Sequence, residues 1–215
     1  MKTLVEHNGG LGDVILDTAY LKKLKEEDPT GELDLITYYG SAEIFYNANY
    51  LDTIYPVPND YCVTQMNDEL YNKYDRHIYV IGMLSWAFFT KNKTLFEQRK
   101  EFYHVNASPD DIEINLDKTL PDDMFAELEC PVVFSAPGNQ KRKSGKHISK
   151  KTWETIFNNY KDITFIQIGT EKYDFTFNDL DNLIDLKDKI TIQQSLSAIS
   201  LSKFVIGCDN FLNHA

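Results

Sequence analysis

Three stretches of the sequence combine glycine, acidic and basic residues in an order that suits anion binding or proton transfer. Gly9-Gly10-Leu11-Gly12-Asp13 follows a short β-like run. Pro137-Gly138-Asn139 opens a basic stretch that contains Lys146, and Gly207-Cys208-Asp209-Asn210 follows another apolar run. Amides of a glycine turn can hold a phosphate, a lysine can neutralise it, and a carboxylate can accept a proton from a hydroxyl. The three stretches together predict a cleft that binds a charged substrate.

Each stretch also has a simpler interpretation. A carboxylate at Asp13, where a helical pattern opens, is also typical of a helix cap. The lysines and arginine between Pro137 and Lys151 are also typical of a solvated loop. Gly10-x-Gly12 matches the start of a dinucleotide fingerprint, but Ile15 stands where the third glycine is required. An NAD-dependent enzyme is therefore a minor alternative that depends on two glycines alone.

The periodicity of apolar residues predicts an α/β chain in which these stretches follow strands. Residues 2–7 read as a strand, the helical spacing from Leu11 stops at Asp28-Pro29, and residues 33–39 read as a second strand, which makes a βαβ unit with a parallel sheet. Carboxyl ends of parallel strands meet at one edge, where ligands bind. Further strands are expected at 53–57, 77–83, 132–136, 163–168 and 204–207, and a further extended segment at 111–116. Further helices are expected at 41–47, 68–74, 93–105, 149–160, 195–202 and from Asp209.

Composition and charge indicate a folded chain with two unlike halves. Its 215 residues are 42% hydrophobic and 26% charged, which suits one large domain or two small ones. The net charge is −11, divided into −13 over residues 1–130 and +2 over residues 131–215. A protein this acidic is not a non-specific nucleic-acid binder. The polar segment 117–130 reads as a linker, so we expect domains at 1–125 and 126–215.

Other sequence features favour a cytoplasmic protein without a metal. The three cysteines, Cys62, Cys130 and Cys208, are far apart and form no CxxC pair, so they indicate neither a disulfide framework nor a zinc ribbon. The nearly apolar run 78–89 is too short to cross a bilayer, and the N-terminus lacks the pattern of a signal peptide. The histidines form no spaced cluster, so no metal ligands are expected.

Five stretches in the same order resemble the heptosyltransferases, family 9 of the glycosyltransferases. The first is GGLGDVILDTAYLKKLKEEDPTGELDLIT (9–37), in which a glycine-rich turn ends in Gly-Asp and leads into a helix. The second is NANYLDTIYPVP (47–58). The others are PGNQKRKSGKHISKKTW (137–153), QIGTEK (167–172) and VIGCDNFLNHA (205–215), of which the last is similar to the family's Asp-Ser/Thr-Gly-x-x-His signature. The resemblance spans nearly the whole chain and is weakest in the middle.

This resemblance implies a GT-B architecture, in which two Rossmann-like domains face each other across a cleft. In such enzymes the acceptor binds mainly to the first domain and the nucleotide-sugar donor mainly to the second. The family transfers a sugar with inversion, typically an ADP-activated heptose, to a hydroxyl of the lipopolysaccharide core or, in some relatives, of a protein. The resemblance thus predicts a glycosyltransferase with a nucleoside-diphosphate sugar as donor, a carbohydrate or protein acceptor, and no cofactor. It is also compatible with peripheral contact to a membrane.

The resemblance also assigns roles to individual residues. Asp13 matches the family's proposed general base, beside Gly10 and Gly12 of the turn, and Lys146 matches its phosphate-binding lysine. Glu171 lies near the position of a glutamate that holds the ribose. His214 matches the last residue of the signature, where we expect packing or hydrogen bonding rather than catalysis. The expected substrate-binding set is Gly10, Gly12, Asn139, Lys146, Glu171, Asp209, Asn210 and His214.

Two departures from the family pattern motivate a second hypothesis. Phe211 stands where the signature has a glycine, which would let the backbone approach the donor phosphates. The sequence also ends about one turn into the signature helix, so we expect the second domain to be incomplete. The alternative to an enzyme is therefore a non-catalytic protein that binds a nucleotide sugar or a partner on a degenerate transferase scaffold.

Overall fold

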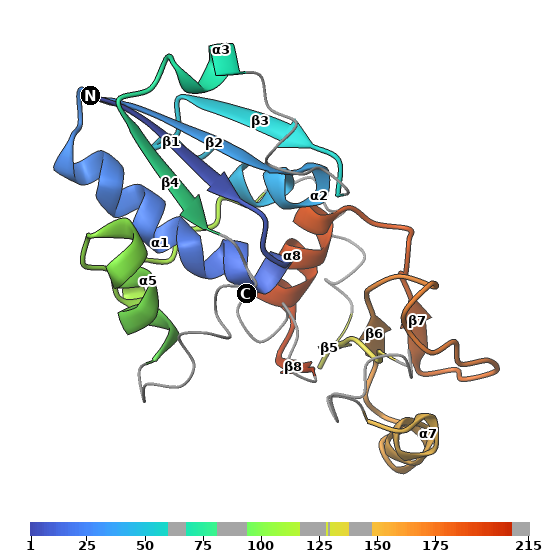
Figure 1. Ribbon diagram of the computed structural model, residues 1–215. Coiled ribbons are helices and arrows are strands. Elements are labelled where there is room, and N and C mark those ends of the chain that lie inside the picture. Colours follow the sequence, from blue (N-terminus) through green and yellow to red (C-terminus); the bar gives the residue numbers. More distant parts are fainter. Residues whose placement is uncertain (60–67, 81–93, 117–127, 129, 138–147, 208–215) are drawn as a thin grey trace. The chain divides into compact units, whose positions relative to one another are not determined.

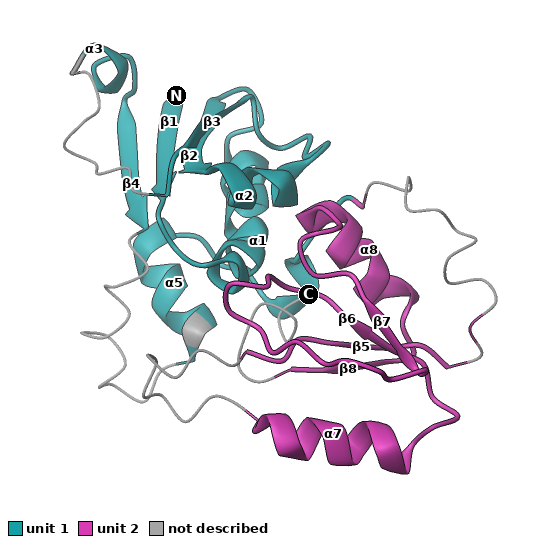
Figure 2. Ribbon diagram, turned by 90° about the vertical axis from the view of Figure 1, so that its right-hand side faces the viewer, with its two compact units in different colours: residues 1–115 teal, residues 116–215 magenta. Residues whose placement is uncertain are grey.

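The structure is a computed structural model that describes residues 1–59, 68–80, 94–116, 128, 130–137 and 148–207 (Figure 1). The chain divides into two compact units, Met1–Asn115 and Leu116–Ala215 (Figure 2). The domain boundary predicted between residues 125 and 126 lies outside the described residues. Among the described helices, none has the length and apolar character needed to span a membrane.

The first unit alternates strands and helices. In chain order it contains β1 (Lys2–His7), α1 (Leu11–Glu27), β2 (Glu32–Tyr38), α2 (Tyr39–Ala42), the 3₁₀ turn η1 (Glu43–Phe45), β3 (Thr53–Val57), α3 (Asp68–Tyr71), β4 (Arg76–Val80), α5 (Leu95–Tyr103) and the 3₁₀ turn η5 (Pro109–Asp111).

The strands of this unit form one parallel sheet in the order β3-β2-β1-β4. The chain adds β2 and β3 on one side of β1 and then β4 on the other side, so the order reverses between β1 and β4. His7 and Val80, which end these two strands, lie opposite each other. In open α/β sheets, ligands bind outside the carboxyl ends of the strands at this reversal. The turn after His7 is therefore placed where a ligand is expected.

Helices α1 and α5 pack against each other in the first unit (Figure 1). The rings of Tyr20 and Tyr103 stack with their centroids 5.1 Å apart, and the Tyr20 hydroxyl donates to the Phe96 carbonyl. Helix α5 begins with a capping box, in which Thr94 and Glu97 satisfy each other's backbone amides. This packing fixes the side chains of α5 relative to the first turns of α1.

The second unit repeats the same strand order. It contains β5 (Val132–Phe134), α7 (Lys150–Asn159), β6 (Phe165–Gln167), β7 (Leu183–Asp185), α8 (Ile192–Leu201) and β8 (Phe204–Ile206). These strands form a parallel sheet in the order β7-β6-β5-β8, so here the order reverses between β5 and β8.

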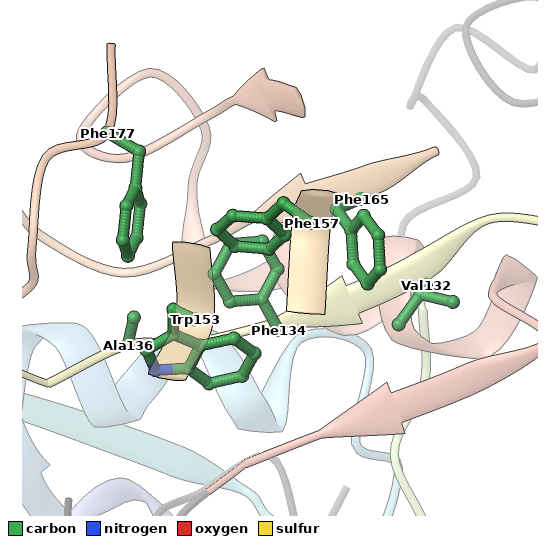
Figure 3. Close-up of a cluster of buried hydrophobic side chains, with 7 residues drawn as sticks. All are labelled: Val132, Phe134, Ala136, Trp153, Phe157, Phe165 and Phe177. Carbon is green, nitrogen blue, oxygen red and sulfur yellow. The ribbon is translucent and has the colours of Figure 1, made fainter. Parts of the chain in front are cut away.

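An aromatic cluster forms the core on one face of the second sheet (Figure 3). Trp153 and Phe157 of α7 lie on Phe134 of β5, with ring centroids 4.8 and 5.2 Å away. All three side chains are fully buried. Ser149 caps α7 by accepting from the Thr152 amide. Trp153 therefore belongs to the core of the second unit.

Most of the elements predicted from the sequence are confirmed within a few residues, but two predictions differ. Strand β7 was not predicted, because Leu183 and Ile184 are flanked by Asn182 and Asp185 and form no longer apolar run. The extended segment expected at 111–116 begins later, because Pro109–Asp111 form a 3₁₀ turn, and residues 112–116, which follow it, pair with no described strand. The helix expected from Asp209 lies outside the described residues.

The aromatic core makes the first testable prediction. Phe157→Ala should destabilise the second unit by about 3–5 kcal/mol, because the buried ring leaves a cavity between α7 and the sheet. Tyr160→Ala is the matched control, since Tyr160 ends the same helix with 55% of its surface exposed. Urea unfolding followed by circular dichroism measures both variants. Equal losses for the two variants would contradict the packing described here.

Candidate active site

The carboxyl end of β1 leads directly into the proposed site. The amide of Asn8 donates to the Val80 carbonyl, so the chain leaves the sheet between β1 and β4. Gly9 is buried and Gly10 is exposed, and Gly10 is the N-cap residue of α1. Gly12 and Asp13 then lie in the first turn of the helix. The sequence prediction that Gly10, Gly12 and Asp13 share one turn at a strand end is therefore confirmed.

The carboxylate of Asp13 is paired with a residue that the sequence analysis did not identify. Arg99 of α5 donates from Nη2 to Asp13 Oδ1 at 2.9 Å, and Asp13 keeps 38% of its side chain exposed. Oδ2 of Asp13 has no partner among the described residues. No side chain caps the start of α1 by a hydrogen bond, so Asp13 does not act as an N-cap, although its charge lies in the first turn, where the helix dipole favours it.

Behind Asp13 lies a second carboxylate that is fully buried. Asp17, one turn further along α1, accepts from Nε of Arg99 through Oδ1. Its other oxygen, Oδ2, lies 2.6 Å from Nε2 of His7, although the two atoms are out of line for an ideal hydrogen bond. His7 Nδ1 accepts from the Gly9 amide at 3.1 Å, so this nitrogen carries no proton. His7, Asp17, Arg99 and Asp13 thus form one continuous chain of contacts.

Burial and charge set the protonation of the groups around Asp17. Burial alone lowers the pKa of Arg99, but the charges of Asp17 and Asp13 outweigh it and raise that pKa above the ordinary value. Burial, assisted by the charge of Asp17, raises the pKa of Tyr103 well above its usual range. Arg99 therefore stays charged and Tyr103 stays neutral around pH 7.

Of these contacts, the sequence indicates the buried acid Asp17 but not its partner Arg99. Asp17 follows Asp13 by four residues and so lies on the same face of a helix whose neighbouring positions are apolar. A buried acid in such a stripe needs a partner. The partner itself, Arg99, comes from a helix 82 residues away along the chain. No local pattern distinguishes it from the other basic residues of that segment.

The second unit places another acidic side chain at the carboxyl ends of its strands. Asp174 accepts from the Ser135 hydroxyl at 3.1 Å, just after β5, and from the Thr170 amide at 2.9 Å, after β6. A β-carbon on Gly169, whose φ is 130°, would lie 2.3 Å from Oδ2 of Asp174, so glycine is required there. Asp174 was not predicted from the sequence, which pointed to Glu171 instead.

The predicted site residues of the second unit are mostly outside the described part of the chain. Glu171 is exposed, and its backbone amide donates to Asp188 Oδ2 at 2.7 Å. The remaining predicted residues lie outside the described residues: Asn139, Lys146, Asp209, Asn210 and His214, together with Phe211. Within the described ranges no group of three or more acidic, cysteine or histidine side chains could hold a metal ion.

Comparison with known proteins gives matches in structure but not in sequence. No family model matches the chain, and no curated protein matches it. E. coli ADP-heptose lps heptosyltransferase II superposes with a TM-score of 0.69 at 12% identity, covering 100% of this chain and 81% of that chain. A glycosyl transferase family 9 protein from Veillonella parvula DSM 2008 gives 0.69 at 14% identity, over 96% and 75% of the two chains.

E. coli heptosyltransferase WaaC, solved with ADP, gives a TM-score of 0.59 at 14% identity and covers 100% of this chain and 83% of that one. The chain has a heptosyltransferase-like fold. This confirms, as a statement about the fold, the GT-B class and the family 9 resemblance that the sequence predicted. Within this fold, the hydrogen bond from Arg99 to Asp13 connects the turn after β1 to α5.

Gly9 should tolerate a side chain much less well than Gly10 does. A β-carbon on Gly9 would lie 2.5 Å from His7 Cε1 and 3.0 Å from Asp13 Cβ, whereas on Gly10 the nearest atom is Asp13 Oδ2 at 3.9 Å. We expect Gly9→Ala to cost about 1–3 kcal/mol through overpacking. Gly10→Ala should cost about 0.5 kcal/mol as a weaker N-cap. Thermal unfolding of the two variants checks the order, and a reversed order would contradict this geometry.

The acid of the second unit should make stability depend on pH. Burial raises the pKa of Asp174 above its ordinary value of 3.8, although the bonds from Thr170 and Ser135 oppose the shift. The folded state therefore holds this proton more tightly than the unfolded state, and the free energy of unfolding should fall as pH rises through the raised pKa. Asp174→Asn removes the pH-dependent part of the free energy of unfolding that this carboxyl group contributes.

The measurement is the difference in unfolding free energy between Asp174→Asn and wild type as pH rises from below 3.8. We expect the variant to gain relative to wild type, because the amide can donate to Ser135, accept from Thr170 and carry no charge. Asp181→Asn, at an exposed position in the same unit, controls for the loss of one negative charge. A difference that does not change with pH, or that changes in the opposite direction, argues against the burial of the Asp174 charge.

Proposed function

We propose that this protein transfers a sugar from a nucleoside-diphosphate donor to an acceptor hydroxyl, with Asp13 as the general base. The observation that carries the proposal is the placement of Asp13: its carboxylate is partly exposed, lies in the turn that follows β1, and has one oxygen bound to Arg99. A carboxylate within hydrogen-bond reach of a hydroxyl can take its proton as the oxygen attacks. The heptosyltransferase-like fold supports a sugar as the transferred group.

The proposed reaction is a single displacement. The acceptor oxygen forms a bond to the anomeric carbon, its proton passes to Asp13, and the bond from that carbon to the donor phosphate breaks. Attack from the side opposite the leaving group inverts the anomeric centre. The nucleoside diphosphate leaves as an anion, which cations and backbone amides stabilise.

The donor-binding residues remain as the sequence analysis assigned them. In the second unit these are Asn139, Lys146, Glu171, Asp209, Asn210 and His214, with Lys146 on the diphosphate. Gly10 and Gly12 let the backbone of the first unit approach the substrate closely. A donor such as ADP-heptose is supported by the E. coli WaaC structures, one with ADP and one with ADP-2-deoxy-2-fluoro heptose. No cofactor is needed for the displacement, and we propose that the enzyme works in the cytoplasm.

Charge favours a neutral acceptor. Residues 1–130 carry a net charge of −13, which would repel a heavily phosphorylated lipid. We therefore propose a neutral sugar or a peptide-borne hydroxyl as the acceptor rather than a phosphorylated lipopolysaccharide core. Tight and salt-sensitive binding to vesicles of anionic lipid would argue against this choice.

Asp13→Asn should reduce turnover by about 100- to 10,000-fold, because the amide cannot accept the hydroxyl proton. The measurement is ADP release from ADP-heptose, with water or an added sugar as acceptor. Glu27→Gln, at the far end of the same helix and exposed, is the matched control and should keep wild-type turnover. Equal turnover by Asp13→Asn and wild type would show that Asp13 is not the base.

Two other results would change the assignment. If wild type shows no turnover but ADP, GDP or UDP raises its melting temperature, the protein binds nucleotides without catalysis. If none of the three nucleotides stabilises it at high excess, a role in binding another partner replaces the enzymatic proposal.

A further inference from the structure

Arg99 bridges two carboxylates that lie one turn apart on α1. Its Nε donates to Asp17 Oδ1 and its Nη2 donates to Asp13 Oδ1. Because the guanidinium is planar and rigid, the contact with Asp17 fixes the direction in which Nη2 meets Asp13. Resting on the function proposed above, we propose that Arg99 is the positioning residue of Asp13. It holds Oδ1, so that Oδ2 stays on the side of the Gly10 turn, 3.9 Å from where a β-carbon of Gly10 would lie.

Stability alone does not account for the pair of Arg99 and Asp17. The side chain of Asp17 is 0% exposed and that of Arg99 is 8% exposed, so both charges have lost most of their hydration. A buried pair of this kind is often no more stable than apolar side chains of similar size, whereas removing one partner leaves a charge buried alone. The fold therefore gains a fixed guanidinium rather than a large free energy of unfolding. Of the two carboxylates that Arg99 binds, Asp13 is the one that solvent reaches.

Asp17 is itself held from the other side. His7 Nε2 lies 2.6 Å from Asp17 Oδ2, and His7 Nδ1 accepts from the amide of Gly9 in the turn before α1. The contacts thus start at the turn, pass through His7, Asp17 and Arg99, and return to Asp13 beside the same turn. A carboxylate held in this way keeps its place relative to the backbone that meets the substrate. Such placement is worth a large factor in rate, because an error of about 1 Å can lower the rate about 100-fold.

The first test is Arg99→Lys, which keeps the positive charge but loses the planar group that reaches both carboxylates. We expect kcat for ADP release from ADP-heptose to fall by about 10- to 100-fold, with KM for the donor nearly unchanged. Lys100→Arg is the matched control, because Lys100 follows Arg99 on the same helix, is exposed and keeps its positive charge in the variant. A folded Arg99→Lys variant with wild-type kcat would overturn the proposal.

The second test asks whether Arg99 acts through Asp13. In the background of Asp13→Asn, Arg99→Lys should cause no further loss of turnover, because the group that Arg99 positions has already gone. A purely structural role for Arg99 would instead lower the activity in both backgrounds by the same factor. That additive result would also overturn the proposal.

A third variant covers the case in which Arg99→Lys does not fold. Asp17→Asn combined with Arg99→Met removes both buried charges together, so neither remains unpaired. Its crystal structure should show Asp13 in a different rotamer or in more than one. The wild-type rotamer in that variant would overturn the proposal. This readout needs no turnover, so if wild type proves inactive the proposed function fails while the positioning of Asp13 is still decided.

Discussion

The ion pair between Asp17 and Arg99 is the interaction on which the first unit's site depends. It connects two helices that are far apart in the sequence and does so in the interior, where each charge is costly without the other. The ring stacking of Tyr20 on Tyr103 fixes the same two helices from the apolar side. The contacts that hold α1 against α5 therefore also fix the position of the site. A change in how α5 packs would change the position of Asp13.

The two units build the same parallel strand order in different ways. The first has strands of five to seven residues, of which β1 and β2 are mostly buried, and charged contacts between α1 and α5. The second has strands of three residues, which alone give few hydrogen bonds, and an aromatic cluster around Phe134 and Trp153 fills one face of its sheet. In the first unit, the reversal of strand order brings the turn with Gly9 and Gly10 to the carboxyl edge, where anion-binding amides are expected. In the second unit, Gly207 directly follows β8 at the corresponding reversal.

Local patterns in the sequence predicted the fold better than the site. Strands such as Lys2–His7 and the helix from Leu11 follow from apolar periodicity and a glycine turn, which are properties of neighbouring residues. Asp13 could be selected for the same reason. Arg99 and Asp174 could not be selected, because the role of each depends on partners that lie elsewhere in the chain. The partner of Arg99 is Asp17, and the partners of Asp174 are Ser135 and Thr170. Strand β7 was not predicted because its two apolar residues, Leu183 and Ile184, lie between polar neighbours and form no longer apolar run.

Chemical modification of Lys187 would report on the opening of the second unit. Its side chain is almost fully buried, and its ammonium donates to the side chains of Gln167 and Asp185 and to the carbonyl of Phe175. These contacts account for all three ammonium protons. An acylating reagent therefore cannot reach this amine in the folded unit, while the exposed neighbour Lys189 is open to it. The ratio of modification at the two lysines would report how often the second sheet opens in the native protein.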